Sequence, residues 1–337
     1  MVNSSPSAAG ASEAPASDAP ASDAPASDAP AADGEEFTIA TVVKLTGVAW
    51  FDRMEVGVNR FNDDHPEIDA FQTGHSTADP AEQVRVIEDL IAQGVDAICV
   101  VPNSTQSLEA VLKKAMDQGI VVIAHEASDI ENADADVEAF VNSEYGAHFM
   151  ENLGELMGGK GQYTTFVGSL TATSHNEWVD ASTALQAETY PEMEVVSNKN
   201  ETTEDSDIAY QKTKELLTAY PDLVGFQGSA MTDAPGVARA IEEAGKADST
   251  VVLGTSLVSV SGQYLETGAI DMISFWDPAE AGYAMNELAL HLLKGGEITD
   301  GMSITAPGYQ NLKLDGKVLY GSAWIDVTKD NMGDYDF

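Results

Sequence analysis

Residues 37–51 read Phe37-Thr-Ile-Ala-Thr-Val-Val-Lys-Leu-Thr-Gly-Val-Ala-Trp-Phe51 and decide the fold. The apolar run 37–43 predicts a buried strand, and Met54, Val58 and Phe61 recur at the spacing of an amphipathic helix. Between them lies a strand-to-helix loop with a lysine, a glycine and two adjacent aromatics. Such loops, at the carboxyl ends of strands in an open parallel sheet, line the ligand crevice. We therefore expect residues 44–51 to form one wall of a site for a small polar ligand.

The same alternation of strand and helix continues along most of the chain. Strands are expected at about 37–43, 68–74, 96–101, 120–124, 137–142, 162–168, 193–197, 223–228, 250–254 and 269–275. Helices are expected at about 51–64, 79–93, 106–118, 145–157, 175–189, 205–219, 233–244, 259–267 and 279–294. Such alternation is typical of parallel sheets covered by helices on both faces. The predicted fold class is α/β, with two doubly wound parallel-sheet lobes.

The two sets of strand–helix units divide the folded part of the chain near residues 142–143. We expect lobe one to comprise residues 37–142 plus 276–306. Lobe two is expected to comprise residues 143–275 plus 307–337, with the tail 307–337 packed across it. Residues 303–326 alternate in the manner of extended strands.

Residues 1–36 are of low complexity. The unit Ala-Pro-Ala-Ser-Asp recurs at 14–18, 19–23 and 24–28 and then decays at 29–33. This composition cannot form a core, and proline keeps it extended. We expect a disordered tether to an anchor, in which Met1 replaces a secretion signal that carried a lipid-bearing cysteine. The alternative is a cytoplasmic protein with a disordered N-terminus.

The chain carries 56 acidic and 16 basic residues, for a formal net charge of −40. This charge argues against nucleic-acid binding through a basic patch. One interpretation is a moderately acidic, solubilising surface. The interpretation that we favour is a protein of a halophile that works at molar salt, where the Debye length falls to about 3 Å. The single cysteine, Cys99, permits no intrachain disulfide and is expected in the core.

Catalytic and metal-binding motifs are absent from the sequence. It contains no nucleophile elbow, Walker loop or His-Glu-x-x-His pattern, and the Gly-rich stretch 154–161 closes a predicted helix rather than opening one. The six histidines have no ligand spacing. We expect no enzyme activity, no cofactor and no metal.

Candidate ligand contacts gather in the loops that follow the predicted strands. Aromatic faces stack on the C–H face of a sugar ring, and carboxylates, amides and lysine bind its hydroxyls. The candidates are Lys44, Trp50, Phe51, Glu126, His175, Asn176, Trp178, Ser229, Met231, Ser256 and Asp277. Each has a structural alternative: Trp50 and Trp178 could pack helices, Glu126 could be a solvated surface acid, and His175 and Asn176 could cap a helix. The hypothesis rests on six loops agreeing. Removing Lys44 or Glu126 should then weaken binding and leave the ligand-free stability nearly unchanged.

Several stretches resemble the periplasmic sugar-binding proteins of ABC importers, of the ribose-binding type. They are the opening 37–51 segment, Gly94-Val-Asp-Ala-Ile-Cys-Val-Val-Pro102, Gly119-Ile-Val-Val-Ile123, Ala219-Tyr-Pro-Asp-Leu223 and Phe275-Trp-Asp-Pro-Ala-Glu-Ala-Gly282. Lys44, the 176–178 segment and the ending Asn331-Met-Gly-Asp-Tyr-Asp-Phe337 are similar to the branch that binds autoinducer-2 or rhamnose. The resemblance implies a monomer whose two lobes are joined by a three-strand hinge. It also implies an extracellular or periplasmic location at the outer face of the cytoplasmic membrane, and ABC permease subunits as partners.

The resemblance also bears on the ligand. Autoinducer-2 binders have a lysine where Lys44 stands and an aspartate where Glu126 stands. They have Asp-Gln in place of residues 174–175, and proline and alanine in place of Ser229 and Met231. These differences favour a pentose, a deoxyhexose such as rhamnose, or another small sugar. Ribose-type binders place an arginine at the position of Ala127, so the resemblance does not extend to the ribose contact which that arginine makes.

Two alternative functions stay open. The first is also a binding protein of an importer: a receptor that binds autoinducer-2 for uptake. A sugar-sensing effector domain of a regulator would share the fold, but residues 1–36 cannot form the DNA-binding domain that should precede it.

Overall fold

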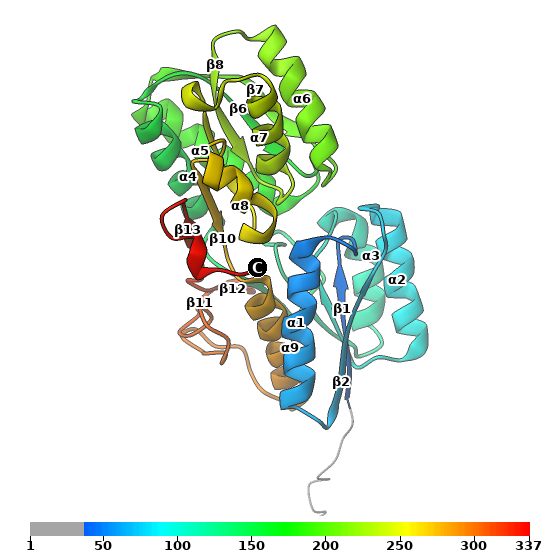
Figure 1. Ribbon diagram of the computed structural model, residues 1–337. Coiled ribbons are helices and arrows are strands. Elements are labelled where there is room, and N and C mark those ends of the chain that lie inside the picture. The colour runs from blue at the N-terminus through cyan, green and yellow to red at the C-terminus, as the bar shows by residue number, and fades with distance from the viewer. Residues whose placement is uncertain (1–36) are drawn as a thin grey trace, which may run out of the picture. The chain divides into compact units, whose positions relative to one another are not determined.

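The computed structural model describes residues 37–337, so the expected tether at 1–36 lies outside the described residues. Figure 1 shows two α/β lobes, each built on one sheet, which confirms the predicted fold class. The strand order is β11-β12-β5-β4-β3-β1-β2 in the first sheet and β13-β10-β9-β8-β6-β7 in the second. Strands β1–β5 and β6–β10 therefore repeat one doubly wound order, and β1/β3 and β6/β8 are the two topological switch points.

The bounds of most elements agree with expectation to within three residues. The strands are β1 (Phe37–Val43), β2 (Ile68–Gly74), β3 (Ala97–Val100), β4 (Val121–Ala124), β5 (Ala135–Glu138), β6 (Lys160–Val167), β7 (Glu192–Glu201), β8 (Leu223–Gly228), β9 (Val251–Thr255), β10 (Met272–Phe275), β11 (Lys313–Asp315), β12 (Val318–Tyr320) and β13 (Ile325–Val327). The helices are α1 (Ala49–Asp64), α2 (Pro80–Gln93), α3 (Thr105–Met116), α4 (Asn142–Leu156), α5 (Thr173–Thr189), α6 (Ser206–Ala219), α7 (Asp233–Glu243), α8 (Val258–Thr267) and α9 (Pro278–Leu293), with 3-10 turns η1 (Ala247–Ser249) and η2 (Met332–Asp334).

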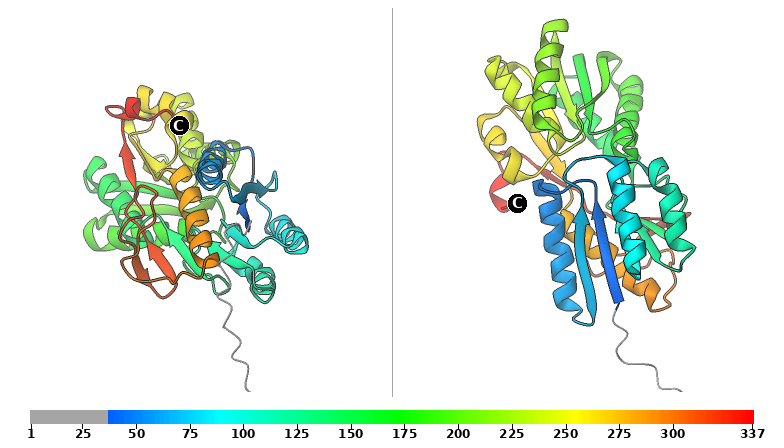
Figure 2. Two further views of the ribbon diagram at one scale, coloured as in Figure 1. Left: turned by 90° about the horizontal axis from the view of Figure 1, so that it is seen from below. Right: turned by 90° about the vertical axis from the view of Figure 1, so that its right-hand side faces the viewer.

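Both faces of the first sheet are buried, which explains why its strands are apolar at successive positions rather than alternating. Ala40 and Val42 of β1 belong to a core with α2 and α3. Ile39 and Val43 face the opposite way, into the core that contains α1 and α9. Figure 2 shows α1 and α9 together on one side of this sheet and α2 and α3 on the other.

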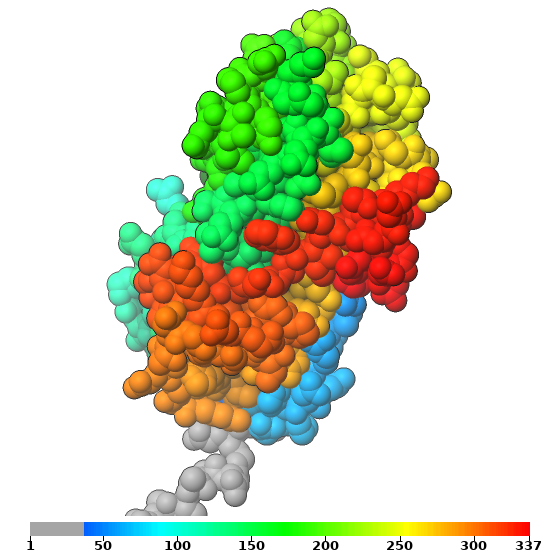
Figure 3. All heavy atoms as spheres, turned by 90° about the vertical axis from the view of Figure 1, so that its left-hand side faces the viewer, coloured from blue at the N-terminus to red at the C-terminus, as the bar shows by residue number. Residues whose placement is uncertain are grey.

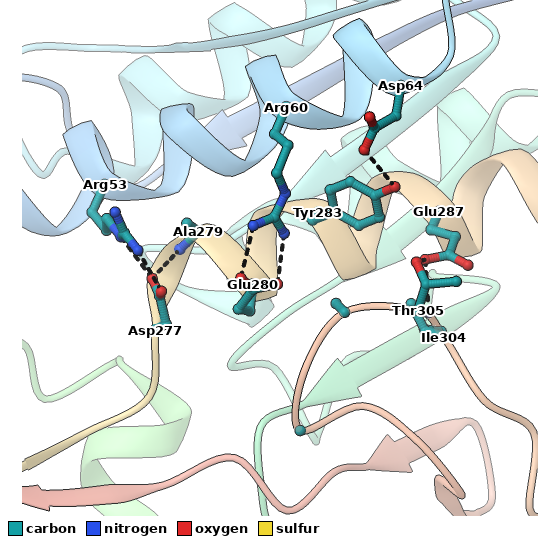
Figure 4. Close-up of polar contacts among 12 residues, drawn as sticks. Arg53, Arg60, Asp64, Asp277, Ala279, Glu280, Tyr283, Glu287, Ile304 and Thr305 are labelled. Atoms are coloured by element: carbon teal, nitrogen blue, oxygen red, sulfur yellow. Dashed lines mark hydrogen bonds and ion pairs between the residues drawn. The ribbon is translucent and has the colours of Figure 1, made fainter.

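Helices α1 and α9 pack closely although 213 residues separate the end of one from the start of the other. A Cβ at Gly57 of α1 would lie 1.8 Å from the carbonyl oxygen of Ala279 of α9, so only glycine permits this approach. Figure 4 shows the polar contacts along the same pair of helices. Nη1 and Nη2 of Arg60 donate to Glu280, at 2.8 and 2.6 Å, and the Tyr283 hydroxyl donates to Asp64. Helix α1, whose first turn carries the candidate aromatics, is thereby held against α9.

The tail corrects one part of the expected domain division. Residues 307–337 were expected in lobe two, but β12 pairs with β5 of the first sheet and β11 pairs with β12. Only β13 joins the second sheet, antiparallel to β10. Alternation along 303–326 indicated extended chain but not its partner strand, and only three short strands form there. Figure 3 shows the tail, orange to red, running over both lobes.

The chain passes between the two sheets three times. The connections follow β5, β10 and β12, at residues 139–141, 276–277 and 321–324. Two of them are bonded to each other at the crossing, where Gly321 N donates to Glu138 O at 2.8 Å and Ala323 N donates to Ala139 O at 3.0 Å. The lobes are thus joined by three adjacent segments, as the fold class predicted.

Candidate functional site

The loop after β1 is held by amide side chains. Gln83 Nε2 donates to Val43 O at 3.3 Å and to Val101 O at 2.8 Å, and Asn103 Nδ2 donates to Lys44 O at 2.8 Å. Gly47, with φ of 81°, makes the turn into α1. These bonds fix the backbone of Lys44 at the switch point of the first sheet, where ligands of open α/β sheets bind.

A cavity lies between the two lobes at the carboxyl ends of the strands. It encloses about 420 Å³ of atom-free space, the part open to solvent included. Lobe one, the connecting segment 276–277 and lobe two contribute Lys44, Leu45, Val48, Trp50, Phe51, Glu126, Trp276, His175, Trp178, Glu204, Ser229, Met231, Thr232 and Thr255. Eight of the eleven candidate contacts are therefore brought together around one cavity.

A buried ion pair lies at the centre of the polar part of the cavity. Lys44 Nζ donates to Glu126 Oε2 at 2.5 Å, and the two side chains are 5% and 4% exposed. Ser174 of the other lobe donates to the same oxygen at 3.2 Å. Burial by itself raises the pKa of Glu126, but the charge of Lys44 and its hydrogen bond outweigh burial and lower that pKa to about 2. Burial likewise lowers the pKa of Lys44, and Glu126 and Glu204 overcome it, so the pKa is raised. Both groups are charged at neutral pH.

Two buried histidines beside this pair are neutral. Burial and the Lys44 charge lower the pKa of His175 to about 3, and burial lowers the pKa of His125. Nδ1 of His175 accepts from Gly168 N at 3.1 Å, which assigns the proton to Nε2 and makes that atom a donor. Nδ1 of His125 bonds Val137 O at 2.6 Å, so its Nε2 accepts from Trp276 Nε1 at 3.2 Å. His125 thereby orients Trp276.

Trp276 is the centre of the aromatic wall. Its ring centroid lies 4.7 Å from that of Trp50 and 5.8 Å from that of Trp178, both in edge-to-face arrangement. Trp178 Nε1 donates to Asn142 Oδ1 at 2.7 Å, which fixes that indole as well. Three indoles from lobe one, the connecting segment and lobe two thus meet at one place, and hydrogen bonds orient those of Trp276 and Trp178.

Three candidate contacts do not line the cavity. Asn176 Nδ2 donates to the carbonyls of Ser169 and Ala172, where it closes the loop before α5. Ser256 Oγ donates to Met231 O at 2.9 Å. In the structure they hold the loops that the cavity residues occupy.

Asp277 is the third candidate contact that does not line the cavity. Its two carboxylate oxygens accept from Arg53 at 2.8 and 2.6 Å (Figure 4), and it caps α9 through Ala279 N at 2.9 Å. The residue before it, Trp276, lines the cavity instead. The two side chains lie on different sides of the segment, because successive residues of an extended segment point to opposite sides.

Six residues that line the cavity were not among the candidates chosen from the sequence: Leu45, Val48, Glu204, Thr232, Thr255 and Trp276. Glu204 was missed because β7 was expected to end at 197 and runs to Glu201, so its loop lies four residues later. Burial raises the pKa of Glu204 against the lowering effect of Lys44. Leu45 and Val48 lie within residues 44–51, the loop predicted to form one wall of the site, so their position in that loop could have indicated them.

Two further searches concern residues 37–337 only. No helix in this part of the chain combines the length and apolar character needed to cross a bilayer. Within the same range, no group of three or more His, Cys, Asp or Glu side chains is arranged to hold a metal ion.

Comparison with known proteins places the chain in a family. A model described as the periplasmic binding protein domain matches residues 39–297. The D-ribose/D-allose-binding protein of Pseudomonas aeruginosa is 25% identical over 276 residues, which cover 77% of this chain and 83% of that protein.

Two solved structures share the fold. A Clostridium phytofermentas ABC transporter solute-binding protein with bound L-rhamnose superposes with a TM-score of 0.82 at 19% identity, over 90% of this chain and 98% of that one. LsrB from Clostridium saccharobutylicum in complex with AI-2 gives a TM-score of 0.80 at 23% identity, over 89% and 100%. The matching family and fold are those of substrate-binding proteins, which are not enzymes. The chain belongs to the periplasmic binding protein family.

Proposed function

We propose that this protein is the substrate-binding component of an ABC importer that captures a small neutral sugar between its two lobes. The sugar is a pentose, a deoxyhexose such as rhamnose, or a sugar of similar size. The protein acts as a monomer outside the cytoplasmic membrane, tethered through residues 1–36, and delivers its ligand to the permease subunits.

The observation that carries the proposal is the cavity between the lobes. It combines the buried Lys44–Glu126 pair with the indoles of Trp50, Trp178 and Trp276. Aromatic faces and charged hydrogen-bonding groups around one small cavity suit a ring that has both C–H faces and hydroxyls.

The polar groups around the cavity differ in whether they would accept hydrogen bonds from a sugar or donate them to it. Glu126 keeps one oxygen that is not engaged by Lys44, and a carboxylate oxygen accepts from a sugar hydroxyl. Nζ of Lys44 and Nε2 of His175 donate. Trp50, Phe51, Trp178 and Met231 supply apolar contact. Among the residues that line the cavity, the one lysine or arginine is Lys44, and Glu126 already pairs with it, so sugar phosphates and sugar acids should be rejected.

Relatives agree with this chemistry. The similar proteins include one named for D-ribose and D-allose, one with bound L-rhamnose and one with bound AI-2. These relatives support a small polyhydroxylated ligand, but the ligand differs from one relative to another.

The experiment is a thermal-shift screen in molar salt with D-ribose, D-allose, L-rhamnose, D-arabinose and AI-2. A ligand at 100 times its dissociation constant adds about 2.7 kcal/mol. For about 300 ordered residues this raises the melting temperature by about 4 °C. D-Ribose 5-phosphate serves as the anionic control and should give no shift. A screen in which no sugar raises the melting temperature would remove the proposal.

A further inference from the structure

The lobe-two wall of the cavity contains two hydroxyls that the protein leaves without a partner. Within residues 37–337, Ser229 Oγ and Thr232 Oγ1 are buried and form no hydrogen bond. Both line the cavity, and Ser229 is only 1% exposed. Buried polar groups are nearly always paired, so each such group calls for an explanation.

The other such atoms in the described part of the chain lie elsewhere. They belong to Gln72, Asp136, Gln227, Arg239, Asn286 and Tyr309, none of which lines the cavity. Ser229 and Thr232, by contrast, occupy a single loop between β8 and α7 (Figure 1). Two unpaired hydroxyls in one four-residue loop, facing one cavity, point to a ligand.

The local structure explains why these hydroxyls are free. Thr232 is the N-cap residue of α7, a position where threonine ordinarily bonds the first turn, yet with φ −84° and ψ −13° it makes no such bond. The following residue, Asp233, binds the loop instead: its carboxylate accepts from Ser229 N at 3.1 Å and from Ala230 N at 2.8 Å. The Thr202 hydroxyl donates to the same carboxylate at 2.6 Å.

The backbone of the loop is therefore fixed without the two hydroxyls. Ser256 adds a further bond to Met231 O at 2.9 Å. A fixed loop with unengaged hydroxyls needs no rearrangement to bind, which lowers the entropic cost of ligand binding.

We propose that Thr232, together with Ser229, hydrogen-bonds the ligand and determines its specificity. This inference rests on the proposed function and deepens it. Because a hydroxyl both donates and accepts, the pair requires hydroxyl or carbonyl groups on the side of the ligand that faces lobe two. Leu45, Val48 and Phe51 of lobe one supply apolar lining for the C–H or methyl groups of the ligand.

The test is Thr232→Val, which removes the hydroxyl and keeps the side-chain shape, with Thr232→Ser as the variant that restores it. The matched control is Thr213→Val. Thr213 is also buried in lobe two, but its hydroxyl donates to Ala209 O at 2.8 Å and it lies outside the cavity. The probe is whichever of D-ribose, L-rhamnose and D-arabinose gives the largest thermal shift, and its affinity is measured by calorimetry in molar salt.

The two variants should show opposite patterns. Removing an unpaired buried hydroxyl should leave the ligand-free melting temperature unchanged or raise it, whereas removing a bonded one should lower it. For Thr232→Val we expect an affinity two- to tenfold weaker and no loss of ligand-free stability. For Thr213→Val we expect unchanged affinity and a lower melting temperature. Thr232→Ser should recover most of the affinity.

Three results overturn the inference. One is wild-type affinity for Thr232→Val while the wild-type protein binds the probe; the proposed function then stands and only the inference fails. Another is a fall in the ligand-free melting temperature of Thr232→Val as large as that of Thr213→Val, which would show that the hydroxyl is paired within the protein. If no probe stabilises the wild-type protein, the proposed function fails and the inference fails with it.

Discussion

Breaking the Lys44–Glu126 pair should destabilise the protein even without ligand. From the sequence, both residues read as contacts whose removal leaves ligand-free stability nearly unchanged. The structure makes them a buried pair, 2.5 Å apart, with side chains 5% and 4% exposed. Lys44→Met would leave the Glu126 carboxylate buried without its cation, because only Ser174 still donates to it.

The magnitude follows from the pKa of Glu126. Its ordinary value of 4.5 falls to about 2 in the folded protein, and the largest lowering effect is the charge of Lys44. A difference of this size corresponds to about 3 kcal/mol. Breaking one partner of a buried pair costs about 3–5 kcal/mol in other proteins. We therefore expect Lys44→Met to lower the free energy of unfolding by about 3 kcal/mol.

The assay is urea denaturation of four proteins in molar salt: wild type, Lys44→Met, Glu126→Gln and the double variant. A buried pair is screened little by salt, so the effect should persist under these conditions. The double variant leaves no unpaired charge, and its loss of stability should be smaller than the sum of the two single losses by at least about 1 kcal/mol.

The pH dependence gives an independent check. Because the folded-state pKa of Glu126 is depressed, its contribution is present above about 4.5 and is lost as the pH falls towards 2. The stability difference between wild type and the double variant should shrink across that interval. Single variants within about 0.5 kcal/mol of wild type, or losses that simply add in the double variant, would refute the reasoning.

The remaining predictions concern the scaffold and the surface. The melting temperature should rise from low salt to molar salt, because 56 acidic residues face 16 basic ones; a melting temperature that does not rise would remove the hypothesis of a halophile protein. Asp277→Asn should lower the melting temperature, since it weakens the contacts to Arg53 and the cap of α9, while calorimetry should give the wild-type sugar affinity; a large loss of affinity would return Asp277 to the ligand site. Gly57→Ala should destabilise the protein by about 1–3 kcal/mol in urea, because its Cβ would meet the Ala279 carbonyl, and a neutral result would show that α1 and α9 separate easily.

The elements of the fold could be predicted from the sequence because buried parallel strands and their helices differ in periodicity. Which strands pair with each other could not be predicted. The tail's alternation marks β12 as extended, but nothing local says that Val318 pairs beside Asp136 of lobe one. The length of β7 was also underestimated, since its polar end, Ser197–Glu201, does not read as a strand. That error alone removed Glu204 from the expected site.

The candidate site was predictable to the level of loops and less so to side chains. Lys44 and Glu126 were chosen because they lie within two residues of the ends of β1 and β4, at the sheet edge that faces the cavity. Asp277 was chosen over Trp276 because residue type favoured the carboxylate, and only the structure shows that carboxylate engaged by Arg53. The free hydroxyl of Thr232 depends on Asp233 binding the loop through its backbone, which no spacing rule encodes.

The central claim, that a sugar binds in the cavity beside the Lys44–Glu126 pair, is tested most directly by tryptophan fluorescence. Three of the four tryptophans line the cavity, and Trp324 does not. Titration of the best sugar from the thermal-shift screen into wild-type protein should give a saturable change with one site per chain. The double variant Lys44→Met/Glu126→Gln should lose most of that response. A wild-type response that is absent for every sugar, or that the double variant retains in full, would contradict the account.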